Sequence, residues 1–96
     1  MLENITRADF ADLEPQALTL TIAGRQCHPH IDTLKEFTAH SERPHAPFTL
    51  ILTAPHDWRY PQGIYELQHP TLGTLQLFMV PIGLCEQGMR FEIIFN

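Results

Sequence analysis

The sequence lacks any apolar run long enough to cross a membrane as a helix. Such a helix needs about 18 consecutive apolar residues, and no stretch of the 96 residues approaches that length. The first residues, from Met1 to Ile5, also lack the basic start and apolar centre of a secretory signal. We therefore expect a cytoplasmic protein that has no membrane partner.

Positive charge is also scarce and dispersed. Six Lys and Arg residues stand against eleven Asp and Glu residues, which gives a formal net charge of −5 with neutral histidines. No two of the basic residues are adjacent. Nucleic-acid binding requires clustered positive charge that replaces the counterions of the phosphates. The charge distribution thus argues against a nucleic-acid partner.

Only two cysteines, Cys27 and Cys85, are present, and no C-x-x-C spacing occurs. Two cysteines without a secretory signal indicate free thiols in a reducing compartment. We expect both to be small, half-buried apolar residues, since free cysteine is often buried. A structural disulfide is the alternative.

Catalytic signatures are missing as well. Ser41 is the only serine, and it stands beside His40 in a polar loop, where adjacent residues rarely form a nucleophile–base pair. No G-x-S-x-G, phosphate-binding or dinucleotide-binding glycine pattern occurs, and the acidic residues are spread along the chain. We expect no enzyme, no cofactor and no metal.

The composition that remains is that of a globular protein, with 44% hydrophobic and 18% charged residues. The length of 96 residues allows one domain, which we place at residues 1–96. A short helix is expected at about 6–14, with Thr6 as its cap and Asp9 three residues later in a capping-box arrangement. Phe10 and Leu13 would share one face of that helix, and Pro15 would end it.

Beyond residue 17, apolar and polar side chains alternate with the period of a β-strand. In the last strand, Phe91, Ile93 and Phe95 should face inward together with Met89, and Arg90 and Glu92 outward. Pro70 and Gly73 suit a four-residue hairpin turn. The strands are expected at about 17–22, 27–38, 48–53, 64–69, 74–81 and 89–95. The sequence therefore predicts a mainly β protein, a small antiparallel barrel or sandwich of about six strands whose N-terminal helix plugs one end.

The C-terminal half resembles a family of small bacterial proteins known only as a domain of unknown function. Residues 63–73 carry G-x-Y-x-L-x-H-P-x-L-G, residues 77–83 carry L-F-x-V-P-I-G, and residues 91–96 end the chain as F-E-x-x-F-N. The opening F-x-x-L at Phe10 is similar too. Members of the family are often described beside phage-tail-collar-like proteins, and their shared residues are turn and core residues. The resemblance thus implies a shape-holding domain and supplies no catalytic residues.

The loop from Pro55 to Gly63 is the strongest candidate for binding. It contains Trp58, Arg59 and Tyr60, and these residue types dominate the energetics of protein interfaces. We predict that the three bind a partner. The alternative is that Trp58 and Tyr60 fold over one end of the barrel and complete a small core.

The histidines offer a second candidate. His28 and His30 are two residues apart, so on one strand both would face the same side and meet one metal ion. With Glu36 and His69 this is a near miss to the cupin pattern, because the spacings differ and Pro29 intervenes. The alternative for His28 and His30 is a place at exposed loop edges. His69 precedes the turn at Pro70 and is expected to hydrogen-bond backbone groups of that turn.

Two functional hypotheses follow. The first is a non-enzymatic structural or protein-interaction module, accessory to a phage-tail-like or surface assembly, which binds a protein partner or a second copy. The apolar last strand, at about 89–95, would then extend a partner's sheet through an exposed edge. The second is a cupin-like barrel that binds a metal or small ligand through His28 and His30.

Overall fold

The computed structural model describes residues 2–38 and 44–96 and shows a mainly β fold. Two short 3₁₀ turns, η1 (Leu2–Asn4) and η2 (Arg7–Asp9), precede the strands. The strands are β1 (Thr19–Ile22), β2 (Arg25–Cys27), β3 (His30–Glu36), β4 (Phe48–Ala54), β5 (Gly63–His69), β6 (Gly73–Cys85) and β7 (Gly88–Phe95). None of the helical segments in these ranges is both long enough and apolar enough to span a membrane. His40 and Ser41 lie outside the described residues.

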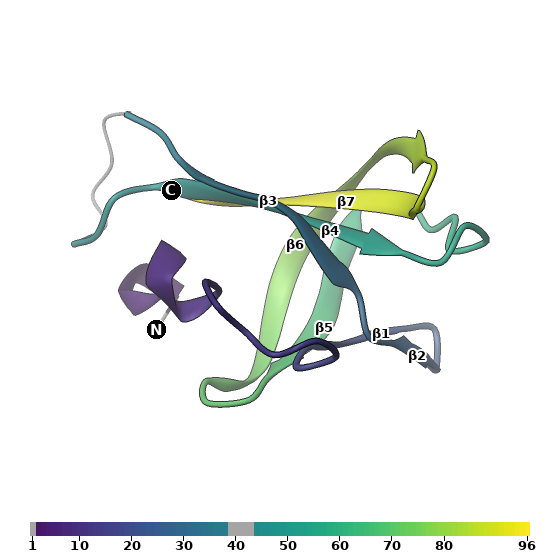
Figure 1. Cartoon of the computed structure of the whole chain (residues 1–96), viewed down its shortest axis with the longest axis horizontal. Helices are drawn as coiled ribbons and strands as arrows, with labels where there is room; N and C mark the ends of the chain where they lie inside the picture. The colour runs from purple at the N-terminus through teal and green to yellow at the C-terminus, as the bar shows by residue number, and fades with distance from the viewer. Residues whose placement is uncertain (1, 39–43) are drawn as a thin grey trace.

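All strand pairs are antiparallel, and their order in the sheet is β2-β1-β5-β6-β7-β4-β3. Strand β6 turns this sheet into a curled half-barrel, because it changes partner along its length. Up to Met79 it pairs with β5, and from Val80 it pairs with β7, with a register shift between Pro81 and Gly83. In Figure 1, β5 and β6 consequently cross the layer formed by β7, β4 and β3. The mainly β, antiparallel prediction is confirmed, and the described residues form seven strands in an incompletely closed barrel.

The core lies on the inner face of this half-barrel. Alternate residues of β7 (Phe91, Ile93 and Phe95) are buried, whereas Arg90 and Glu92 between them are half-buried on the other face, as the sequence pattern predicted. Phe95 stacks on Phe48 of β4, with the ring centroids 4.4 Å apart. The alternation along each strand therefore places one apolar face inside.

The predicted N-terminal helix at 6–14 is wrong in type and length. The capping contact is present, since the Thr6 backbone nitrogen donates to the Asp9 carboxylate at 2.7 Å, but only one 3₁₀ turn follows. Asp12 adopts a φ of 57°, which a right-handed helix cannot continue through. Phe10 still reaches the core, where its ring lies 5.8 Å from that of Phe95.

The predicted strand at 27–38 is in fact two strands, β2 and β3. Ala23 and Gly24 have positive φ values of 52° and 80°, as a two-residue β-hairpin turn requires, so β2 already begins at Arg25. Pro29 then separates β2 from β3, because proline lacks the backbone donor that a continuous strand needs. These two strands form the two edges of the sheet, and the chain passes from one edge to the other through His28 and Pro29.

Candidate functional site

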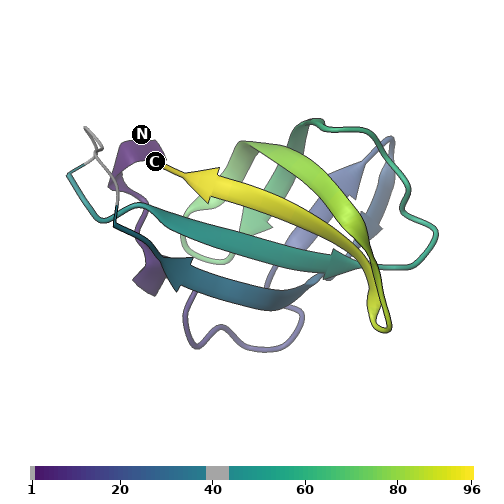
Figure 2. The ribbon, with the colours of Figure 1, turned by 90° about the horizontal axis from the view of Figure 1, so that it is seen from above.

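A groove lies where β6 and β7 separate. The two strands pair from their shared hairpin as far as Val80 and Glu92 and then diverge, which Figure 2 shows from above. The space between them, of about 440 Å³, is lined by Leu77, Phe78 and Val80 of β6, by residues 92–96 and by Leu2 and Glu3 of η1. We call it the β6–β7 groove. Its volume lies within the range of about 300–1,000 Å³ that is usual for binding pockets.

Large apolar side chains are exposed at this groove. Phe78 is 53% exposed and Ile94 is 52% exposed, because both stand at strand positions that face away from the core. Directly across from Phe78, on β5, lies Ile64, which is 66% exposed. These three side chains place apolar surface on the outer face of three strands, where polar residues are the rule.

The charged side chains among the described residues of the groove lining are acidic, those of Glu3 and Glu92. Glu92 is half-buried between Ile51 of β4 and Val80 of β6, its partners in the sheet. Among the described residues, the Glu92 carboxylate has no hydrogen bond and no ion pair, and the groove lining contains no Lys, Arg or His. A cationic group would therefore find favourable electrostatics in this groove.

The last strand is not an edge strand, contrary to the sequence-based expectation. It pairs with β4 along Met89–Phe95, so that side is closed. On the other side, pairing with β6 ends at Glu92, and the stretch from Ile93 to Phe95 has no strand partner among the described residues. Only this short stretch of β7, at the groove, remains open for pairing.

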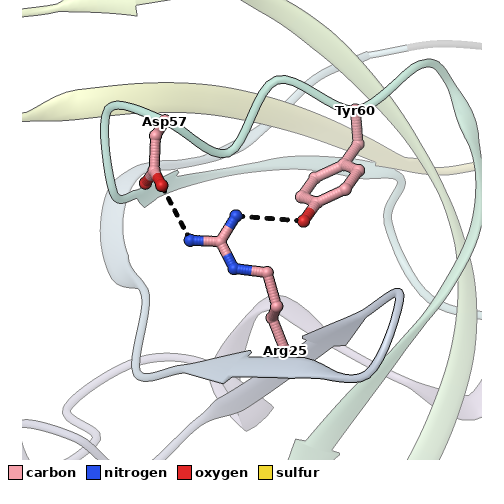
Figure 3. Close-up of polar contacts among 3 residues, drawn as sticks. All are labelled: Arg25, Asp57 and Tyr60. Atoms are coloured by element: carbon pink, nitrogen blue, oxygen red, sulfur yellow. Dashed lines mark hydrogen bonds and ion pairs between the residues drawn. The ribbon is translucent and has the colours of Figure 1, made fainter.

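On the loop between β4 and β5, which carries the predicted binding residues, Tyr60 and Asp57 contact Arg25 of β2, as Figure 3 shows. Arg25, on β2, donates to the Asp57 carboxylate at 2.8 Å and to the Tyr60 hydroxyl at 3.0 Å, and its guanidinium lies 5.1 Å from the Trp58 ring centre. The hydrogen bond to Tyr60, followed by that to Asp57, raises the pKa of Arg25 above its usual value. The cluster ties the β1–β2 hairpin to this loop.

Trp58 therefore completes the core, since only 2% of it is exposed. Tyr60 is half-buried, with its ring at right angles to that of Trp58 at 5.8 Å, and Arg59 alone is exposed. The loop is also held at a second point, where His56 Nε2 lies 3.0 Å from the Glu86 carbonyl of the β6–β7 hairpin. Arg25 was assigned to a turn from the sequence, so its role in this cluster was missed.

His69 serves the turn that follows it, as predicted. Its Nδ1 accepts hydrogen bonds from the backbone nitrogens of Thr71 at 3.1 Å and Leu72 at 3.2 Å, which fixes the proton on Nε2. The Nε2–H then donates to the carbonyl of Asp9 at 2.6 Å. The ring is only 5% exposed and thus connects the β5–β6 turn to the N-terminal segment.

The structure does not bring His28 and His30 together on one strand. His30 begins β3, whereas His28 precedes Pro29 and directs its Nδ1 to the carbonyl of Leu18 at 3.0 Å. Both side chains are exposed, as the loop-edge alternative stated. Within residues 2–38 and 44–96, no three His, Cys, Asp or Glu side chains are placed to hold a metal ion together.

Both cysteines are free and half-buried, which confirms that prediction. Burial raises the pKa of the Cys27 thiol to about 11, and the nearby positive charge of Arg25 only partly opposes this shift. The thiol is therefore protonated at neutral pH and is a poor nucleophile.

The exposed apolar positions of the groove were missed, although the sequence holds a signal for them. Phe78 lies within the run Leu77-Phe78-Met79-Val80, and Ile94 follows Ile93, so both break the alternation of apolar and polar residues. In a strand with one buried and one solvent-facing side, such a break places an apolar side chain on the solvent-facing side.

Residues 5–95 match the model of a family described as a domain of unknown function, DUF6916, and the chain belongs to this family. The family resemblance noted from the sequence is thereby supported at the level of an uncharacterised domain. No curated protein and no solved structure shows significant similarity to the chain.

Proposed function

Since membership of this family assigns no activity, we propose that the protein is a non-enzymatic protein-interaction module whose partner binds at the β6–β7 groove. The observation that carries the proposal is the pair of exposed apolar side chains, Phe78 and Ile94, that line the groove. Apolar groups that cluster beside a groove on a soluble domain are typical of interaction sites.

Exposure of Phe78 and Ile94 leaves part of their hydrophobic stabilisation unused in the isolated chain. Complete burial of one Phe or Ile side chain is worth about 1.5–3 kcal/mol relative to leaving it exposed. Phe78 and Ile94 are about half exposed, so each forgoes a substantial part of that stabilisation in the isolated chain. A partner that covers both would recover it as binding energy.

The histidines support a non-catalytic role. The His69 ring is engaged on both nitrogens by backbone groups, and His28 is directed to a backbone carbonyl. A general acid or base needs a nitrogen that faces substrate. These two rings instead stabilise loops and turns.

The larger assembly in which this module acts is part of the proposal. The resemblance to small proteins described beside phage-tail-collar-like proteins favours an accessory role in a phage-tail-like or surface assembly. The groove would then be the contact with another component of that assembly.

Site-specific photo-crosslinking of the full chain tests the proposed surface. A photoreactive phenylalanine analogue is placed at position 78 or 94, and in a control at Leu72, which is exposed on the β5–β6 turn outside the groove. In cells that naturally produce the protein, we expect a discrete protein adduct from 78 and 94 and none from 72. The same partner should escape co-purification with a Phe78→Thr, Ile94→Thr double variant whose melting temperature is unchanged.

Two results would contradict the proposal. One is equal crosslinking from all three positions, which would indicate contact without a preferred surface. The other is unchanged partner recovery by the folded double variant, which would place the interaction elsewhere on the molecule.

A further inference from the structure

From the open edge of β7, the exposed side chains of Phe78 and Ile94 and the Glu92 carboxylate, we infer that the partner supplies a short extended segment that pairs with β7 at Ile93–Phe95 and carries a Lys or Arg close to Glu92. This inference rests on the proposed function and specifies the chemistry of the partner. On the outer face of the segment, the basic residue stands two positions from a large apolar side chain, as Glu92 stands two positions from Ile94.

The open backbone groups of β7 require an extended conformation of the partner's segment. Backbone groups of a strand point alternately to its two sides, and β4 satisfies only one side of Ile93–Phe95. On the side of β6, this stretch has no strand partner among the described residues. It spans about 10 Å at about 3.3 Å per residue, so it accommodates about three residues of an added strand.

The side chains beside this edge determine the apolar character of the segment. On the outer face, Ile94 and Phe78 flank the opening from β7 and β6, and both are about half exposed. An added strand between them would direct alternate side chains to the same outer face. Large apolar residues at those positions would cover both neighbours and provide the main anchor.

The Glu92 carboxylate determines the charge that we expect on the partner's segment. Glu92 faces outward two residues before Ile94 and is half-buried among Ile51 and Val80, and its carboxylate has no hydrogen bond or ion pair with the described residues. Among those residues, the groove lining contains no basic side chain. A Lys or Arg of the incoming segment would therefore form a charge-assisted hydrogen bond in a partly desolvated place.

The same charges disfavour a second copy of this chain as the occupant. The chain carries a formal net charge of −5, so two copies repel at low ionic strength. A two-fold symmetric contact through the groove would bring Glu92 of each copy to the same small interface. Within the part of the lining that the structure describes, no basic side chain compensates for that repulsion.

A synthetic peptide array probes this chemistry with the full chain. Its eight-residue peptides carry Val, Leu or Phe on one face of the strand and Lys, Thr or Glu two positions farther along the same face. The strongest binders are measured again by fluorescence anisotropy. We expect Lys-containing peptides to bind about tenfold more tightly than their Glu counterparts at low salt, and the difference to shrink as salt is added. N-methylation of the peptide backbone should abolish binding, because it removes strand pairing.

A charge-reversal variant links the preference to Glu92. Glu92→Lys should reverse the preference, so that Glu-containing peptides bind more tightly than Lys-containing ones. Glu86→Lys is the matched control, because it makes the same change in net charge on the exposed β6–β7 hairpin turn, outside the groove lining. The control should retain the preference for Lys, and melting temperatures establish that both variants are folded.

Three results would overturn the inference. The first is that no peptide binds at a concentration of about 1 mM, which corresponds to very weak binding. The second is that Lys-containing and Glu-containing peptides bind equally well. The third is a stable dimer in light scattering that the Phe78→Thr substitution dissociates. Crosslinking from positions 78 and 94 to a partner, together with any of these results, would leave the proposed surface standing while rejecting the charged strand. Loss of that crosslinking as well would reject both.

Discussion

Replacing Gly88 by alanine provides the sharpest test of the fold. Gly88 begins β7 with a φ of +150°, and a Cβ placed on it would lie 2.0 Å from the carbonyl oxygen of Ala54 and 3.2 Å from Thr53 Cγ2. The backbone of Ala54 cannot retreat easily, because it is paired with the neighbouring Met89 in the β4–β7 ladder. Alanine at this position therefore requires the two strands to separate locally.

The size of the effect follows from two contributions. Steric overlap in a packed region costs about 1–3 kcal/mol, and an alanine held at a glycine-type φ costs about another 1–3 kcal/mol. We expect Gly88→Ala to lower the free energy of unfolding by about 4 kcal/mol, a large share of the 5–15 kcal/mol typical of a domain. Urea titration followed by the fluorescence of Trp58, the only tryptophan, measures this change.

Gly73→Ala is the matched control for this substitution. Gly73 also has a positive φ, +80°, but nothing lies within 4 Å of the Cβ it would carry. We expect this variant to lose only about 1 kcal/mol, the cost of a left-handed conformation for an L-residue. Equal losses at the two glycines would refute the argument, since they would show that the close approach of Ala54 has no energetic consequence.

Three further predictions concern the other clusters. His69→Ala should lower the free energy of unfolding by about 1–3 kcal/mol, because the backbone nitrogens of Thr71 and Leu72 lose their acceptor; urea titration checks it, and no loss would contradict the turn role. Arg25→Ala should lower the melting temperature and shift Trp58 fluorescence, whereas Arg59→Ala, at an exposed residue of the same loop, should change neither. The contribution of Cys27 to stability should be complete below pH 9.0 and decline as the pH rises toward about 11, since burial raises the pKa of the folded thiol. Urea titrations of the protein and of Cys27→Ala across that range measure it, and parallel stability curves would contradict the shift.

Much of the fold was predictable because the period of a strand is a local property. Alternation along 17–22, 48–53 and 89–95 located β1, β4 and β7 to within two residues and assigned Phe91, Ile93 and Phe95 to the core. The turn around Gly73 and the capping contact between Thr6 and Asp9 were equally predictable, because each depends only on residues close together in the sequence.

The errors occurred where distant contacts decide local conformation. No residue near Asp12 in the sequence indicates its positive φ, so the 3₁₀ turn was predicted as a longer helix. Strand β6 was expected to end at 81 but continues to Cys85, because its second half finds a new partner in β7. The burial of Trp58 under Arg25, 33 positions earlier, likewise depends on a distant contact, so the sequence left open whether Trp58 binds a partner or completes the core.

By itself, the order of the residues determined most of the strands, their apolar faces and where most turns lie, because these features depend on side chains within a few positions of one another. Only the tertiary structure decided that β6 leaves β7 at Val80 and Glu92, that the space between them is a groove, and that the Glu92 carboxylate stands in it without an ion pair among the described residues. The physical reason is that the path of a strand between two partners is set by the packing of the whole sheet, whereas its alternation is set residue by residue.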